Sequence, residues 1–474
     1  MNKDIDDSAS KRVSVYISFI CICFLCLSLS CHKKTANTQH KPNQPDIPII
    51  ETNNQEDKKV WDSPSYSIVK ADLVDQTHTQ YVSYTIPDTD LNTIPVKSWQ
   101  PVWQYTCQNK GYPIVTNLSI DDQAYLLINN PLVHIDAYYG FTQPETFFDD
   151  IFALKPEAKQ KLWQYRINSI CGRNMLIQDD CIFIGTSQGP MGLDDDFFMF
   201  CLNKQTGQEL WRCPINGITE TNIVFHDNRV YFGVSGYDGN FIYCVDALTG
   251  QVIYQCLAPK GIGVYFDYSF KFVFVDDLLY FTVPNSPKLY SFHTKSKQYK
   301  LVWQSSLTAV SELTYSKPYL LWEGTQESKG GSTSYLFAIN LHEYALEWVI
   351  QMSKGLRNYL NEPLVKENLV YFDSYGFIAC IDMKTKQLLW SFADPVHDIQ
   401  EFILEEDKVF IGMEQEPYEA RDTEQYYRRY ILSLDANTGK ANWKMQKGAK
   451  LSCLYQDKIL LTDENNMYMI EENR

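Results

Sequence analysis

The sequence is short of positive charge, with 42 Lys and Arg against 58 Asp and Glu and a formal net charge of −16. Phosphate contacts supply much of a protein's affinity for nucleic acid, so this balance argues against a nucleic-acid partner. Gly and Pro are also scarce, at 22 and 20, whereas Tyr, Phe and Trp number 32, 25 and 10. With 45% hydrophobic residues, this composition excludes a disordered or collagen-like chain and favours β structure.

Motifs for metal binding and catalysis are missing as well. The 8 His form no His-x-x-x-His or His-Glu-x-x-His pair, and no Gly-x-Ser-x-Gly nucleophile elbow occurs. Gly185, Gly189 and Gly192 are not followed by a helical pattern, which argues against a phosphate loop. We therefore assign no catalytic, cofactor-binding or metal-binding residue and expect no cofactor.

Acidic pairs exist, but the repeat described below explains them. The pairs at 121–122, 179–180 and 276–277 all fall at one kind of hairpin turn, where Asp is favoured for backbone reasons. The Asp run at 194–196 could bind Ca²⁺ but lacks EF-hand spacing, so a solvated loop is the favoured interpretation.

One long apolar run exists, from Val13 to Ser30, preceded by Lys11 and Arg12. This pattern is typical of a secretory signal peptide over residues 1–30. The ending Leu29-Ser30-Cys31 resembles a bacterial lipobox, which implies lipidation of Cys31, although Ser28 stands where that motif usually has Leu. An uncleaved transmembrane helix is the alternative. Both predict a protein attached to a membrane from outside the cytoplasm.

The rest of the chain divides by composition. Residues 31–59 are rich in Asn, Gln, Lys and Pro and are predicted to be a flexible tether. Residues 60–99 form an N-terminal extension that could wrap the main body, add a strand to it or plug it. Residues 100–474 form the main body.

That body repeats a single unit. Six 14-residue stretches align without a gap and read strand, short turn, strand, aromatic; they begin at 150, 198, 241, 335, 377 and 430, and a seventh, at 288, has two extra residues. Each is preceded by a 12-residue segment with two apolar runs around a polar turn, which predicts a second hairpin. Every unit thus supplies four strands, and the terminal aromatics, 42 to 60 residues apart, are Trp103, Trp163, Trp211, Tyr254, Trp303, Trp348, Trp390 and Trp443.

The two ends of the body fit together. After Trp443 the chain contains one more hairpin and one strand, without a terminal aromatic, while PVWQY at 101–105 echoes KLWQY at 161–165. We therefore predict an all-β fold: an eight-bladed β-propeller of four-stranded antiparallel blades, its ring closed by the N-terminal strand.

Two repeat positions have a predicted structural role. The terminal aromatic is expected to cover the joint between neighbouring blades. Cys201, Cys244 and Cys380 share a position that is Ala153, Ser291, Ala338 or Ser433 in other units, which predicts a small buried site holding free thiols.

The unit strand–Asp/Asn–x–x–Thr-Gly–x–x–x–Trp, clearest from Asp246 to Tyr254 and from Asp435 to Trp443, resembles the repeat of PQQ-like (quinoprotein-type) β-propellers. The resemblance covers roughly residues 100–474. With its lipoprotein-like N-terminus, the chain is similar to the BamB-like lipoproteins of outer-membrane β-barrel assembly. That similarity implies a non-catalytic docking scaffold in the bacterial envelope, as an outer-membrane lipoprotein.

The alternative within this superfamily is a PQQ-dependent dehydrogenase. Those enzymes hold the quinone in the central channel with Ca²⁺, a catalytic Asp and often a disulfide between adjacent Cys. This chain has no adjacent Cys pair, and its body is short for such an enzyme.

Two long insertions, around 129–149 and 413–429, are expected to build a partner-binding face. Tyr and Arg anchor many protein interfaces, and these insertions are rich in them and in Phe. Packing over the channel mouth and glycan binding are the alternatives. The candidate residues for an envelope protein partner are Tyr138, Tyr139, Phe141, Tyr418, Arg421, Tyr426, Tyr427 and Arg428.

Overall fold

The computed structural model divides the chain into two units, Met1–Ile50 and Glu51–Arg474, and the residues described here belong to the second. They are 80–84, 89–98, 100–106, 124–128, 149–155, 160–167, 171–186, 197–219, 221–236, 239–258, 271–283, 286–304, 309–310, 313–328, 331–343, 345–352, 361–374, 377–394, 397–414, 429–446, 449–455, 458–462 and 466–471. Within these ranges, no helix has the length and apolar character needed to cross a membrane.

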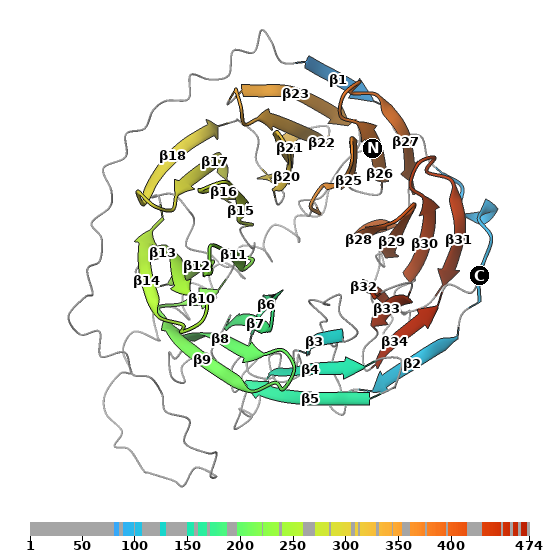
Figure 1. Ribbon diagram of the computed structural model, residues 1–474. Coiled ribbons are helices and arrows are strands. Elements are labelled where there is room, and N and C mark those ends of the chain that lie inside the picture. The colour runs from blue at the N-terminus through green and yellow to red at the C-terminus, as the bar shows by residue number, and fades with distance from the viewer. Residues whose placement is uncertain are drawn as a thin grey trace, which may run out of the picture. The chain divides into compact units, whose positions relative to one another are not determined.

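The described strands form eight sheets that follow one another in chain order (Figure 1). The first sheet contains β3 (Ala124–Ile128), β4 (Asp149–Lys155) and β5 (Gln160–Ile167). The second contains β6 (Cys171–Gln178), β7 (Cys181–Thr186), β8 (Phe197–Asn203) and β9 (Glu209–Ile215). The third sheet contains β10 (Ile218–Thr219), β11 (Val224–His226), β12 (Arg229–Gly236), β13 (Gly239–Asp246) and β14 (Val252–Leu257). The fourth contains β15 (Val273–Val275), β16 (Leu278–Val283), β17 (Ser286–His293) and β18 (Gln298–Gln304).

The remaining four sheets continue the pattern. The fifth contains β1 (Gln80–Tyr84), β19 (Ala309–Val310), β20 (Thr314–Ser316), β21 (Tyr319–Ser328), β22 (Gly331–Asn340) and β23 (Ala345–Met352). The sixth contains β24 (Leu364–Lys366), β25 (Leu369–Ser374), β26 (Phe377–Asp382) and β27 (Leu388–Ala393). The seventh contains β28 (Asp398–Glu405), β29 (Lys408–Glu414), β30 (Arg429–Asp435) and β31 (Ala441–Gln446). The last is β32 (Lys450–Tyr455), β33 (Lys458–Thr462), β34 (Asn466–Glu471) and β2 (Pro101–Thr106).

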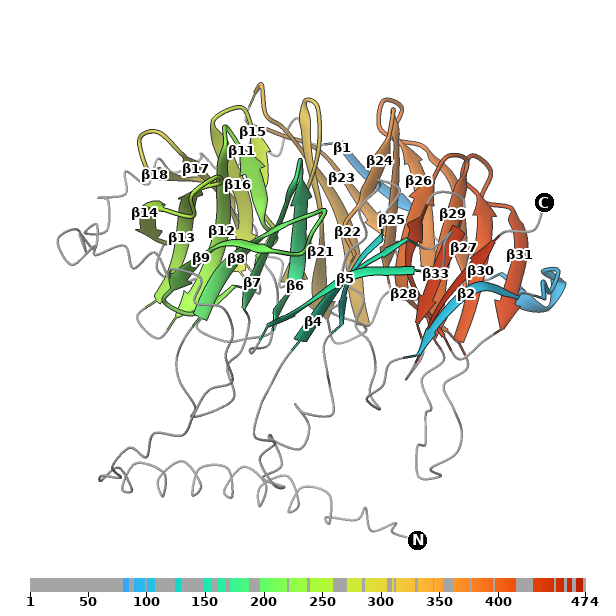
Figure 2. The ribbon, with the colours of Figure 1, turned by 60° about the horizontal axis from the view of Figure 1, so that its bottom comes forward.

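Strand β2 joins the start of the body to its end. It pairs antiparallel with β34, with Trp103 opposite Met469, and so supplies the fourth strand of the last sheet, as predicted. Figure 2 shows that the strands of neighbouring sheets run between the same two faces. The all-β prediction of four-stranded antiparallel sheets is confirmed for five of the eight sheets; among the described residues the other three have three, five and six strands, and β1 pairs in parallel. The closed ring and its count of eight blades stay predictions.

The repeated Asp explains the shape of the outer turns. The Oδ1 of Asp246 accepts hydrogen bonds from the backbone N–H groups of Leu248 and Thr249, at 3.1 and 2.8 Å. Gly250 then adopts a φ of 71°, a left-handed conformation that glycine reaches without strain. Asn203, Asp382 and Asp435 form the same turn. The hairpins between the first two strands also use the left-handed region, at Asp179 and Asp276 for example, which supports turn chemistry as the reason for those Asp pairs.

The small buried position is confirmed. Cys201, Cys244 and Cys380 are fully buried, as are the Ala and Ser residues that replace them in other sheets. All three are free thiols, and burial raises the pKa of Cys380 to about 12 and that of Cys244 to about 11. Such thiols are unreactive at neutral pH, in keeping with a packing role.

The described part of the N-terminal extension runs along the outer strands of three sheets (Figure 1, blue). Strand β1 pairs in parallel with β23, with Gln80 opposite Trp348. The Thr89 N–H then donates to the Ala393 carbonyl of β27 at 2.7 Å. The segment 95–97 next exchanges two backbone hydrogen bonds of 2.8 Å with Lys444 of β31, and the chain enters β2. Two of the three possibilities for this extension therefore hold for residues 80–98: they add a strand to the body, and they wrap around its outer strands.

Candidate functional site

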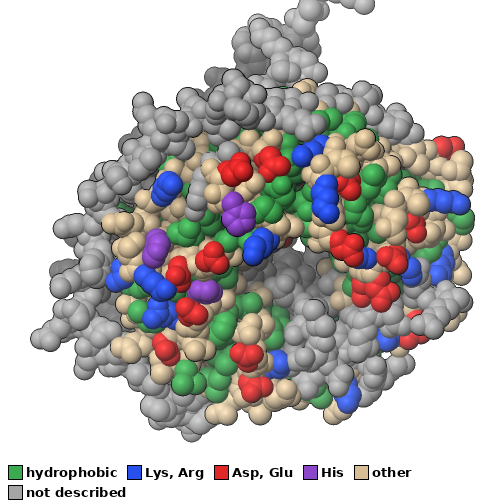
Figure 3. All heavy atoms as spheres, turned by 45° about the horizontal axis from the view of Figure 1, so that its top comes forward, with side chains coloured by type: hydrophobic (Ala, Val, Ile, Leu, Met, Phe, Trp, Pro, Cys, Tyr) green, Lys and Arg blue, Asp and Glu red, His purple; other side chains and the backbone are tan. Residues whose placement is uncertain are grey.

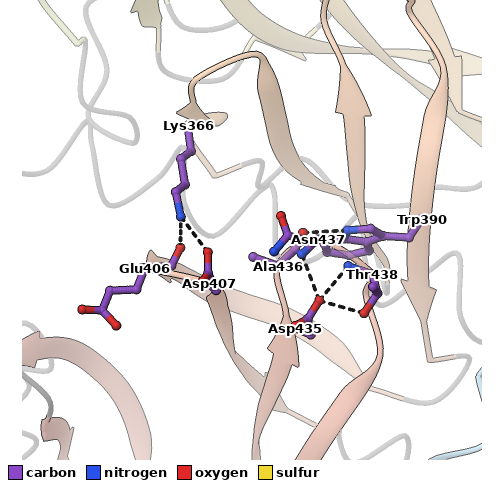
Figure 4. A network of polar contacts seen from close by, with 8 residues as sticks. All are labelled: Lys366, Trp390, Glu406, Asp407, Asp435, Ala436, Asn437 and Thr438. Carbon is purple, nitrogen blue, oxygen red and sulfur yellow. Dashed lines mark hydrogen bonds and ion pairs between the residues drawn. The ribbon is translucent and has the colours of Figure 1, made fainter.

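Three of the terminal Trp residues contact the outer turn of the neighbouring sheet. The Nε1 groups of Trp163, Trp211 and Trp390 each donate a hydrogen bond to a carbonyl in the outer turn of the next sheet, at Lys204, Ala247 and Ala436. Figure 4 shows this contact for Trp390, beside the turn built by Asp435 and Thr438. The indole lies so close to the turn that a Cβ on Gly207, Gly250 or Gly439 would approach it to 2.5 Å. A side chain on any of these three glycines would therefore clash with the docked indole.

Two joints have Lys in place of this glycine, and there a Tyr hydroxyl donates the hydrogen bond to the turn. Lys297, at a φ of 57°, faces Tyr254, whose hydroxyl donates to the Thr294 carbonyl at 3.2 Å. At the joint beyond β23 the equivalent residue is Lys386, and the Tyr comes from β1: the Tyr84 hydroxyl donates to the Lys386 carbonyl at 2.6 Å.

This exchange leaves Trp348 without its expected contact. Trp348 is fully buried and packs into the joint, but its Nε1 has no hydrogen-bond partner among the described residues. The Tyr84 hydroxyl instead accepts a hydrogen bond from the Leu388 N–H at 3.0 Å. The sequence assigned this joint to Trp348 alone and missed Tyr84.

Polar side chains link the sheets where the inner strands begin. Lys271, just before β15, forms an ion pair with Glu362, just before β24. Glu362 also accepts a hydrogen bond from the Thr314 hydroxyl of β20 at 2.9 Å, so three successive sheets are joined through one carboxylate. Asn222 makes a comparable link, since its side chain exchanges two hydrogen bonds with the backbone of Phe272.

Beside these contacts lies a buried carboxylate pair, Glu323 of β21 and Asp373 of β25, each 1% exposed. Asp373 accepts hydrogen bonds from Asn361, from Nδ2 at 2.8 Å and from the backbone N–H at 3.2 Å. Burial raises the pKa of Asp373 to about 7. Burial, together with the neighbouring Asp373 charge, raises the pKa of Glu323 well above its usual value. Two such groups in a low-dielectric interior disfavour double ionisation, so the pair holds a proton near neutral pH.

A third cluster anchors the long insertion between β29 and β30. Glu414 and Arg429, the last and first residues of these strands, form a buried ion pair at 3.1 Å. The carboxylate of Glu401 lies over Gly412, and burial raises the pKa of Glu401 to about 7 although the residue keeps some exposure. Just before β28, the His397 Nδ1 lies 2.8 Å from the Asp394 carboxylate. The two ends of the insertion are thus fixed by charged contacts inside the protein.

The predicted partner residues fall outside the described residues. These predicted partner residues are Tyr138, Tyr139, Phe141, Tyr418, Arg421, Tyr426, Tyr427 and Arg428. The same holds for Cys31, the signal peptide, the tether and the Asp run at 194–196. The buried acids Glu323 and Asp373 were not predicted from the sequence, although the aligned repeats contain a sign of them. Glu323 and Asp373 occupy the position that is Gly185, Gly233 or Gly412 in other sheets, and a charged residue replacing a buried glycine is unusual.

Comparison with known proteins places this repeat in a family. The model for the family described as outer membrane protein assembly factor BamB matches residues 147–445, from the start of β4 almost to the end of β31. The chain belongs to this family. A search of curated proteins found no match.

Solved structures show the same fold at low identity. BamB from Moraxella catarrhalis matches with a TM-score of 0.51 and 12% identity, over 79% of this chain and 100% of that chain. The C-terminal WD40 domain of Sif2 gives 0.55 and 11%, over 80% and 99%, and the computationally designed Ika8 protein gives 0.53 and 13%, over 78% and 99%. At these identities the likeness extends to the β-propeller fold alone.

Proposed function

We propose that this protein is a non-catalytic, membrane-anchored docking scaffold of the bacterial envelope that takes part in outer-membrane protein assembly. The observation that carries the proposal is the match to the outer-membrane assembly factor family over most of the propeller. Lipidated Cys31 would hold the chain at the membrane. A coil as long as residues 31–59 spans on the order of 30 Å, which keeps the propeller close to that surface.

The docking surface in this proposal is the face with the long insertions. The insertion at 415–428 carries Tyr and Arg residues suited to a protein interface, and its ends are held by the Glu414–Arg429 ion pair. A loop with fixed ends loses less conformational freedom on binding, which favours partner affinity.

Photocrosslinking in envelope membranes tests this proposal. A photoreactive amino acid at Tyr139 or Tyr427 should capture a defined envelope protein. The same group at Leu248, which is 85% exposed in an outer turn, serves as the matched control and should not capture it. If Tyr139 and Tyr427 give no adduct beyond that control, the docking face is assigned wrongly.

The dehydrogenase and glycan-binding alternatives are tested on the same protein. Calorimetry with PQQ and Ca²⁺, dye reduction with alcohols and sugars, and a carbohydrate array should all be negative for a scaffold. Saturable PQQ binding with substrate-dependent dye reduction would replace the proposal with an enzyme.

A further inference from the structure

We propose that His226, Asp227 and Asp277 form a binding site for a divalent transition-metal ion of the zinc class. Each residue offers one ligand atom, and the three atoms lie within 4.8 Å of one another. The Nε2 of His226 and the Oδ2 of Asp227 are 3.7 Å apart. Two ligands of one tetrahedral zinc lie about 3.4 Å apart, so small side-chain rotations would bring the three atoms onto one ion.

The site spans two neighbouring sheets at their inner hairpin turns. His226 ends β11, Asp227 follows it in the turn at a φ of 50°, and Asp277 lies in the turn between β15 and β16. The His226 ring stacks on Phe274 of the second sheet, with centroids 4.4 Å apart and planes at 13°. This contact holds the imidazole at the boundary between the sheets. Figure 3 shows histidine, acidic and basic side chains intermixed on this face.

The equivalent joint between two later sheets already holds a cation. Lys366 occupies the His226 position in its own sheet, and Asp407 occupies the Asp277 position in the next. The Lys366 ammonium donates to the Asp407 carboxylate at 3.1 Å and to the Glu406 carbonyl (Figure 4). The repeat therefore places positive charge between these two turns. At the His226 joint the chain supplies an imidazole, which is a good zinc ligand, in place of the ammonium.

Lys295 is the group that a metal ion must compete with. Its Nζ lies 2.7 Å from Oδ2 of Asp277, and this contact lowers the pKa of that carboxyl. Lys295 is largely exposed, so its side chain can move into water when an ion binds. A bound ion would then cross-link the two sheets at their turns. This link would be more rigid than the contact made by the flexible Lys295 side chain.

Zinc titration of the full-length, detergent-extracted protein tests the site, after chelator treatment and without a His tag. Wild type should bind one Zn²⁺ in competition with a chromogenic chelator, and Co²⁺ should give visible d–d absorption. His226→Ala and Asp277→Asn should each weaken binding at least tenfold. Lys295→Met should tighten it severalfold, because the competing ammonium is removed. Asp407→Asn is the matched control from the equivalent joint and should bind as wild type does.

The melting temperature without metal checks that each variant is folded. With Zn²⁺ it should rise for wild type and Lys295→Met, but not for His226→Ala. Zinc binding that survives both His226→Ala and Asp277→Asn would overturn the site, as would the absence of binding at 1 mM or weaker binding by Lys295→Met.

Discussion

Trp211 lies against Gly250 of the neighbouring sheet so closely that a methyl group on that glycine would approach the indole to 2.5 Å. The same indole donates a hydrogen bond of 3.0 Å to the Ala247 carbonyl in that turn. The contact combines burial, a hydrogen bond and a left-handed glycine, and it recurs at Trp163 and Trp390.

Removing this contact should destabilise the protein strongly. Trp211→Ala and Trp390→Ala leave a cavity between two sheets and an unpaired carbonyl, and each should lower the free energy of unfolding by about 3–5 kcal/mol. Urea denaturation followed by tryptophan fluorescence and circular dichroism gives the change. Leu210→Ala alters a neighbour that is 46% exposed and should cost much less. Equal losses for Leu210→Ala and Trp211→Ala would refute the docking role.

The choice of Tyr or Trp at a joint should depend on the residue in the facing turn. Tyr254→Trp alone should destabilise by about 1–3 kcal/mol, since Lys297 stands where three other joints have a glycine on which a Cβ would clash with the indole. Adding Lys297→Gly should restore most of that loss. A double-mutant cycle measures the coupling between the two positions. Additive effects would show that the turn residue does not select the aromatic.

The N-terminal extension should contribute to the stability of the propeller. Tyr84→Phe removes a hydroxyl that donates to Lys386 and accepts from Leu388, two hydrogen bonds at a joint between sheets. We expect a loss of about 1–3 kcal/mol, because two partners become unsatisfied. Thermal melts of the variant provide the measurement, and Tyr84→Trp, which also lacks the hydroxyl, should be no better than Phe. An unchanged melting temperature in both would mean that β1 is only loosely attached.

The buried carboxylate pair should make stability depend on pH. The pKa of Asp373 is raised to about 7 in the folded protein, above the value near 4 expected for an unfolded chain. Between these values the folded form binds more protons, so the free energy of unfolding should fall as pH rises from about 4 to 7, by at most on the order of 4 kcal/mol. Melting temperatures across this range measure the slope.

Asp373→Asn removes the titrating group and should flatten that slope while raising stability at pH 8. Asp382→Asn is the control, because hydrogen bonds in its outer turn lower the pKa of Asp382 and it does not titrate between pH 5 and 8. A slope unchanged by Asp373→Asn would assign the pH dependence to other groups.

Local patterns were enough to predict most of the fold. The Asp-x-x-Thr-Gly turn, the alternation of apolar residues and the terminal Trp each follow from interactions within a few residues or from burial that repeats with the unit. Cys201, Cys244 and Cys380 could be placed in the core because the same position is small in all seven copies of the 14-residue stretch. Because the unit is repeated, each of these inferences rests on several copies rather than on one residue.

Contacts between distant parts of the chain could not be found in this way. Tyr84 meets Lys386 across 302 residues, at a turn where Lys386 stands in place of the glycine found in three other turns. The meeting of Glu323 with Asp373, and of His226 with Asp277, likewise depends on how one sheet is placed against the next. The sequence by itself determined the strands, the turns and the pairing of first strand with last. Only the tertiary structure decided which side chains share a joint, because the packing of whole sheets sets those distances.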